Sequence, residues 1–167
     1  MPVITAQQAG GSNRTAFLDM IAWSEGTSRI PDSDDGYRVL VGATPDKPLT
    51  FSSYATHPDI LNSTFNSTAA GRYQLLYRYW LAYRQLLRLT DFSPLSQDRI
   101  ALQQIRERGA LPFIDIGNFT KAVQLCSGVW ASLLGNDYGQ HVNTITTLQT
   151  AYVNAGGTLV SGASSLA

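Results

Sequence analysis

The sequence is poor in cysteine and histidine. Its 167 residues include one cysteine, Cys126, and two histidines, His57 and His141. A single cysteine excludes an intramolecular disulfide and cannot by itself build a zinc site, so we expect Cys126 to be a buried apolar side chain. The histidines lack metal-type spacing such as H-E-x-x-H. We therefore expect neither a metal nor another cofactor.

Charge is scarce as well, and its two signs are balanced, with 12 Lys and Arg against 12 Asp and Glu. Zero net charge argues against nucleic acid as a partner, because phosphate binding leaves an excess of basic residues. The apolar runs are short. Residues 122–134 fall below the roughly 20 residues of a membrane span, and residues 1–16 lack the apolar core of a secretory signal. We expect no stable membrane association. We also expect the protein to be synthesised in the cytoplasm.

What the chain does have is enough apolar residues, 44%, for one domain with a hydrophobic core. We predict a flexible N-terminal arm over residues 1–13, a single domain over 14–157 and a mobile tail over 158–167. Helical periodicity and caps predict helices near residues 15–23, 75–89, 94–109, 118–130 and 144–155.

Residues 28–70 differ from the rest because prolines, serines and aspartates exclude long helices there. Strand-forming residues at 37–41 and 49–51 predict a small β-rich lobe. The fold class is thus α+β, a mostly helical bundle with a β-lobe, and such proteins bind ligands in the cleft between the lobes.

The chain has only two glutamates, Glu25 and Glu107. Glu107 has arginines on both sides, which favours a solvated surface position. Glu25 follows Ile21 by four residues, so it continues the apolar face of the first helix. Burial raises the pKa of a carboxyl group, as a general acid at neutral pH requires. The alternative is a helix-terminal carboxylate hydrogen-bonded to the next turn.

Other polar and aromatic residues offer weaker candidates. Asp34 and Asp35 supply a second carboxylate of the kind ordinary glycosidases use, or they form a polar turn with Gly36. Aromatic rings such as those of Trp130 and Tyr138 provide surfaces on which sugars stack. Tyr138 lies in a predicted loop and is the better candidate for exposure.

Several longer motifs, taken together, resemble one family. The matching segments are residues 22–27, 70–76, 91–94, 96–98, 101–105, 107–112, 130–133 and 138–140. They resemble the lambda-type endolysins of bacteriophages, in the same order and from about residue 14 to 157. The resemblance is weakest over residues 28–66.

The resemblance implies a lysozyme-like fold and lytic transglycosylase activity on the glycan strands of peptidoglycan. Such enzymes cleave the β-1,4 bond between N-acetylmuramic acid and N-acetylglucosamine and leave 1,6-anhydro ends. The family's catalytic acid maps onto Glu25, and its Gly-Arg-Tyr-Gln motif maps onto residues 71–74. The substrate-binding positions carried over by motif are Tyr73, Gln74, Trp130, Ser132, Tyr138 and Gln140.

By the same resemblance, the protein would act as a monomer in host cell lysis. It would accumulate in the host cytoplasm and reach the periplasm through a holin pore. Two alternatives remain open at this point. One is a hydrolytic muramidase that uses Glu25 with Asp34 or Asp35, and the other is a glycan-binding module without catalysis.

Overall fold

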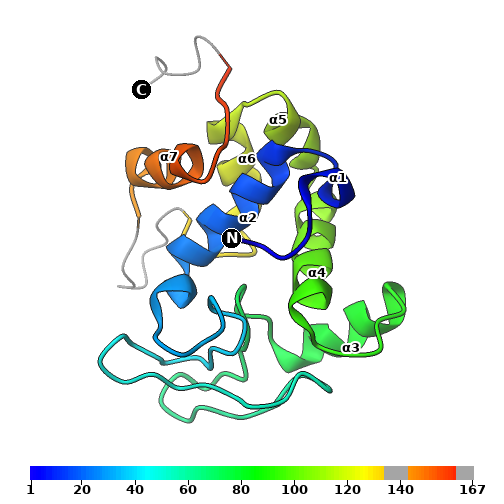
Figure 1. Cartoon of the computed structure of the whole chain (residues 1–167), viewed down its shortest axis with the longest axis vertical. Helices are drawn as coiled ribbons and strands as arrows, with labels where there is room; N and C mark the ends of the chain where they lie inside the picture. Colours follow the sequence, from blue (N-terminus) through cyan, green and yellow to red (C-terminus); the bar gives the residue numbers. More distant parts are fainter. Residues whose placement is uncertain (134–142, 161–167) are drawn as a thin grey trace. The chain divides into compact units, whose positions relative to one another are not determined.

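The computed structural model describes residues 1–133 and 143–160 and divides into two compact units. One unit holds residues 1–24 and the described residues from 101 onward, and the other is Glu25–Ile100. Figure 1 shows the elements along the chain. The helices are α1 (Ala6–Ala9), α2 (Ser12–Ser24), a 3-10 turn η1 (Thr27–Arg29), α3 (Tyr77–Leu86), α4 (Pro94–Glu107), α5 (Leu111–Asp115), α6 (Phe119–Cys126) and α7 (Ile145–Asn154).

The first unit is built around α2, which contacts α1, α5 and α7 (Figure 1). Most residues of α2 between 16 and 22 are buried, so this helix is covered on nearly every side. Phe17 of α2 packs edge-on against the rings of both Phe119 and Tyr152. This packing fixes the C-terminal end of α2, where the chain passes into the second unit.

The N-terminal segment, predicted as a flexible arm over residues 1–13, contains a helix that the prediction did not include. Thr5 and Gln8 form a reciprocal capping box that starts α1, and Ile4 is buried. The T-x-x-Q signal of this box is present in the sequence. At the other end, the predicted tail over residues 158–167 begins with a residue that is bonded to α2. The Thr158 amide donates to Asn13 Oδ1 at 2.9 Å. Residues 161–167 lie outside the described part.

Residues 28–70, predicted as a β-rich lobe, lie in the second unit and are drawn without strand arrows in Figure 1. The two predicted strand segments do pair, through an antiparallel bridge between Val39 and Thr50, and Leu40 also bridges to Ala70. Across the described residues these bridges stay isolated and extend into no regular strand. Gly36 and Gly42, with φ of 91° and 88°, lie on either side of residues 37–41 and limit the length of extended backbone available for a ladder.

Most helix predictions are confirmed, with shifted ends. α4 matches its prediction, α6 is capped by Asn118 and α7 by Thr144. The five-residue α5 was not among the predicted helices. α3 is shorter than predicted, and its Tyr79 and Leu86 are 45% and 59% exposed. Cys126 is free and buried, as expected.

Candidate functional site at the end of helix α2

Glu25 lies one residue beyond α2, at the first position of the turn that opens the second unit. Its side chain is half-buried. The helix stops there because Gly26 has a φ of 76°, a left-handed conformation that glycine adopts without a steric penalty. The predicted position of Glu25 at the end of the helix is confirmed. Its side chain is only partly buried, whereas the helical periodicity indicated a position on the buried face.

Residues 71–74, the Gly-Arg-Tyr-Gln motif, form a tight turn between bridged residues Ala70 and Leu75. Gly71 and Gln74 both have positive φ, 81° and 51°. The Gln74 side-chain amide donates to the Gly71 carbonyl at 2.9 Å, which holds the half-buried Gln74 side chain against its own turn.

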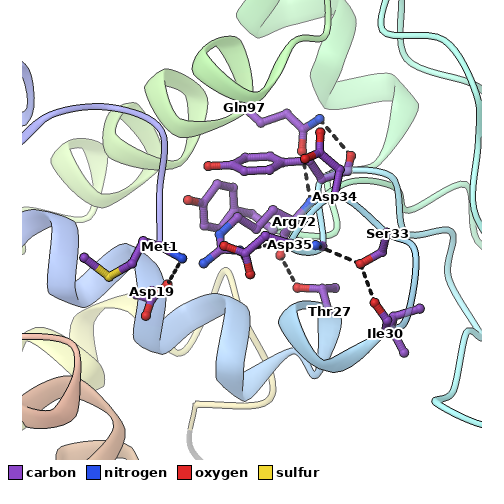
Figure 2. Close-up of polar contacts among 12 residues, drawn as sticks. Met1, Asp19, Thr27, Ile30, Ser33, Asp34, Asp35, Arg72 and Gln97 are labelled. Carbon is purple, nitrogen blue, oxygen red and sulfur yellow. Dashed lines mark hydrogen bonds and ion pairs between the residues drawn. The ribbon is translucent and has the colours of Figure 1, made fainter.

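Gln97 of α4 supports this turn through its side-chain amide (Figure 2). Its Oε1 accepts the Arg72 amide hydrogen at 2.9 Å, and its Nε2 donates to the carbonyls of Tyr37 and Phe92 at 3.0 Å each. A Cβ on Gly71 would lie 2.3 Å from Gln97 Oε1, so only glycine fits this approach. One buried amide therefore satisfies three backbone groups from separate segments.

A buried carboxylate, Asp98, anchors two tyrosines of this unit. Its Oδ1 accepts the hydroxyl hydrogens of Tyr37 at 2.8 Å and Tyr73 at 2.6 Å. Burial and the negative charge of Asp98 hold the pKa of Tyr73 well above its usual value. Only 5% of Tyr73 is exposed, so its ring lies in the interior. The substrate-binding role that the motif implies for Tyr73 stays a prediction.

Arg72 is fully buried and pairs with a carboxylate from the neighbouring loop. Its Nη1 lies 2.9 Å from Asp35 Oδ1 and also donates to the Asp35 carbonyl. The guanidinium lies over the Tyr37 ring at 5.2 Å. A buried guanidinium needs such a partner because an uncompensated charge in the interior is costly. Asp35 therefore has a structural role here.

The two aspartates form the polar turn that the sequence allowed. Asp34 and Asp35 both have positive φ, and the Tyr37 amide donates to the Asp34 carbonyl at 3.1 Å. The Asp34 carboxylate accepts the Tyr54 hydroxyl hydrogen at 2.5 Å. The turn interpretation is thus confirmed.

Trp130 and Ser132, two further candidates, belong to the first unit. Trp130 is buried, and Ser132 is half-buried with its Oγ 2.8 Å from the hydroxyl of Ser24. Asn143 donates to Ser24 Oγ at 3.1 Å and to the Ser132 carbonyl at 3.2 Å. No sequence signal singled out Asn143. Tyr138 and Gln140 lie outside the described residues.

His57 is a core residue, buried against the Phe92 ring at 4.9 Å. Its Nε2 lies 2.8 Å from the Leu75 carbonyl, and its Nδ1 accepts the Asp59 amide hydrogen at 3.1 Å. Burial lowers the pKa of His57, which favours the neutral ring. Over residues 1–133 and 143–160, no group of three or more His, Cys, Asp or Glu side chains could hold a metal ion.

None of the helices in the described ranges has the length and apolar character to cross a membrane.

The helical arrangement defines a protein of lysozyme-like fold. The structure matches that of bacteriophage lambda lysozyme complexed with a chitohexasaccharide, with a TM-score of 0.81 and 50% identity, over 89% of this chain and 97% of that one. It also matches a second structure of the lysozyme from bacteriophage lambda, with a TM-score of 0.78, 48% identity and the same coverage.

The sequence comparisons give the family. The endolysin family model matches residues 15–159. The endolysin of Escherichia phage lambda is 50% identical over 153 residues, covering 89% of this chain and 94% of that protein. The endolysin of Escherichia phage P2 is 47% identical over 166 residues, covering 94% and 98%. The chain belongs to the endolysin family.

Proposed function

We propose that the protein cleaves the glycan strands of peptidoglycan as a lytic transglycosylase, with Glu25 as its catalytic acid. One observation carries the proposal. Glu25 is half-buried at the end of α2, in a turn whose Thr27 is hydrogen-bonded to the Gly-Arg-Tyr-Gln motif at Arg72. The lysozyme solved with a chitohexasaccharide, a chain of linked sugars, is 50% identical to this chain.

In this mechanism the protonated Glu25 carboxyl donates its proton to the glycosidic oxygen as the bond to the leaving sugar breaks. Positive charge develops at the anomeric carbon of N-acetylmuramic acid. The C6 hydroxyl of the same sugar attacks that carbon, and the Glu25 carboxylate takes the hydroxyl proton. The acid is regenerated, and the 1,6-anhydro ring is closed without water.

One carboxyl group suffices because the nucleophile belongs to the substrate. An intramolecular hydroxyl held near the anomeric carbon has a high effective molarity, so no positioned water is needed. The proposed substrate contacts are Tyr73, Gln74, Trp130, Ser132, Tyr138 and Gln140. Among those that the structure describes, Gln74 and Ser132 are half-buried, and Tyr73 and Trp130 are buried.

Hydrolysis is the competing mechanism, with Asp34 or Asp35 activating a water. Both carboxylates already have structural partners, Tyr54 and Arg72, which favours the transglycosylase. Mass spectrometry of digested sacculi distinguishes the two. We expect muropeptides with anhydro ends, 18 Da lighter than the reducing products that water would leave. Reducing ends alone would contradict the transglycosylase and support a muramidase.

We also propose that the protein acts as a monomer and reaches the wall through a holin pore, from host cytoplasm to periplasm. Expression in a Gram-negative host tests this step. Lysis should require either a co-expressed holin or chemical permeabilisation of the inner membrane. Lysis by the endolysin alone would contradict the proposed route.

A further inference from the structure

Thr27 is a buried threonine whose hydroxyl joins two distant segments. Only 2% of the residue is exposed, and its Oγ1 donates to the Arg72 carbonyl at 2.6 Å. A buried hydroxyl must find a partner because an unsatisfied one is costly. The bond therefore ties η1, two residues after Glu25, to the Gly-Arg-Tyr-Gln turn.

The loop that carries Asp35 clamps Thr27 from a second direction (Figure 2). A Cβ on Gly36 would lie 2.9 Å from the Thr27 carbonyl carbon, so the two backbones are in direct contact. The buried Ser33 hydroxyl donates to the Ile30 carbonyl at 2.6 Å and accepts the Gly36 amide hydrogen at 2.9 Å. η1 is thus bonded to this loop at its end as well.

These contacts close a ring. Thr27 bonds to Arg72, Arg72 pairs with Asp35, and Gly36, next to Asp35, packs on Thr27. Between this ring and Glu25 stands only Gly26, whose backbone tolerates conformations closed to other residues. Because Thr27 is two residues from Glu25, the ring constrains the C-terminal side of the turn that carries Glu25.

We propose that Thr27 is a positioning residue, which acts through the backbone to hold Glu25 at the glycosidic oxygen. This inference rests on the proposed function. Misplacing a reacting group by about 1 Å costs up to about 100-fold in rate. Loss of the Thr27 hydroxyl should therefore lower kcat by about 10- to 100-fold and leave KM within about twofold, because the substrate contacts are not on Thr27.

The experiment compares three variants by their initial rates of glycan cleavage on purified sacculi. Cleavage is measured as the sum of anhydro ends and reducing ends formed. Thr27→Val keeps the β-branched shape and removes the donor, whereas Thr27→Ser keeps the donor and removes a methyl group. Thr150→Val is the matched control, because the Thr150 hydroxyl also donates to a backbone carbonyl, that of Thr146 at 2.9 Å, but on the exposed face of α7. Circular dichroism gives the folded fraction of each variant.

We expect a kcat loss in Thr27→Val only, with Thr27→Ser within about threefold of wild type and Thr150→Val unchanged. Two results would overturn the inference. One is a folded Thr27→Val with wild-type kcat. The other is a loss of kcat in both Thr27→Val and Thr27→Ser that is fully explained by the unfolded fraction of each variant. A wild-type chain that cleaves no glycan would instead refute the proposed function, and this inference with it.

Discussion

Replacing Gly71 with alanine should destabilise the second unit far more than an ordinary glycine substitution. Gly71 has a φ of 81°, and its missing side chain makes room for Gln97. The new Cβ would lie 2.3 Å from Gln97 Oε1 and 2.8 Å from its Cδ. Although Gln97 is a flexible side chain, it is buried and holds three backbone groups, so it cannot move without breaking those bonds.

The expected loss in the free energy of unfolding has two parts. A left-handed backbone costs about 1 kcal/mol for a residue with a Cβ. Each of the three Gln97 hydrogen bonds that is lost costs about 1 kcal/mol more. Gly71→Ala should therefore lose about 4 kcal/mol, a large part of the roughly 5–15 kcal/mol that a typical domain has.

Gly109→Ala is the matched control. Gly109 has a φ of 69° and no atom within 4 Å of its notional Cβ, so only the backbone term of about 1 kcal/mol applies. Urea unfolding followed by tryptophan fluorescence measures both variants. A difference between them of less than about 1 kcal/mol would refute the reasoning, because Gln97 would then yield without losing its bonds.

Two further predictions concern buried polar groups of the same unit. Tyr73→Phe should lower the free energy of unfolding by about 2 kcal/mol, because the Asp98 carboxylate loses one of its donors; an unchanged urea midpoint would contradict this. His57 should make stability fall with acid. Burial lowers its native pKa below the unfolded value of about 6.5, so the unfolded chain binds the extra proton first and stability drops as the pH falls below about 6.5. Protonation would also displace the Asp59 amide from Nδ1. His57→Gln should show a smaller difference in unfolding free energy between pH 7.5 and pH 5 than wild type, and an equal difference would count against this role.

The helices that the sequence predicted well are those with local signals. Asn118 and Thr144 cap α6 and α7 through their own side chains, three residues from the amides they accept. A local cap needs no knowledge of the rest of the fold. The position of Glu25 at the end of α2 was predicted in the same way, from the spacing of apolar residues and the resemblance of residues 22–27 to a family motif.

The support of the site could not be predicted because it depends on contacts between distant residues. Gln97 reaches Arg72 across 25 residues, and Tyr73 meets Asp98 across the same interval. Neither Gln97 nor Asp98 shows a periodicity or motif that marks it as the partner of a turn. The burial of Tyr73 beside Asp98 was therefore not indicated by the motif in which Tyr73 lies.

The central claim is that a single carboxyl group, that of Glu25, performs the chemistry. The chain offers its own control, because its other glutamate, Glu107, is exposed and bonded to Gln103 on α4. The test is the rate at which Glu25→Gln and Glu107→Gln clear permeabilised Gram-negative cells, with both variants shown to be folded. Glu25→Gln should be slower by about 100- to 10,000-fold, the usual contribution of a general acid, and Glu107→Gln should match wild type. Clearing by Glu25→Gln at the wild-type rate would contradict the account.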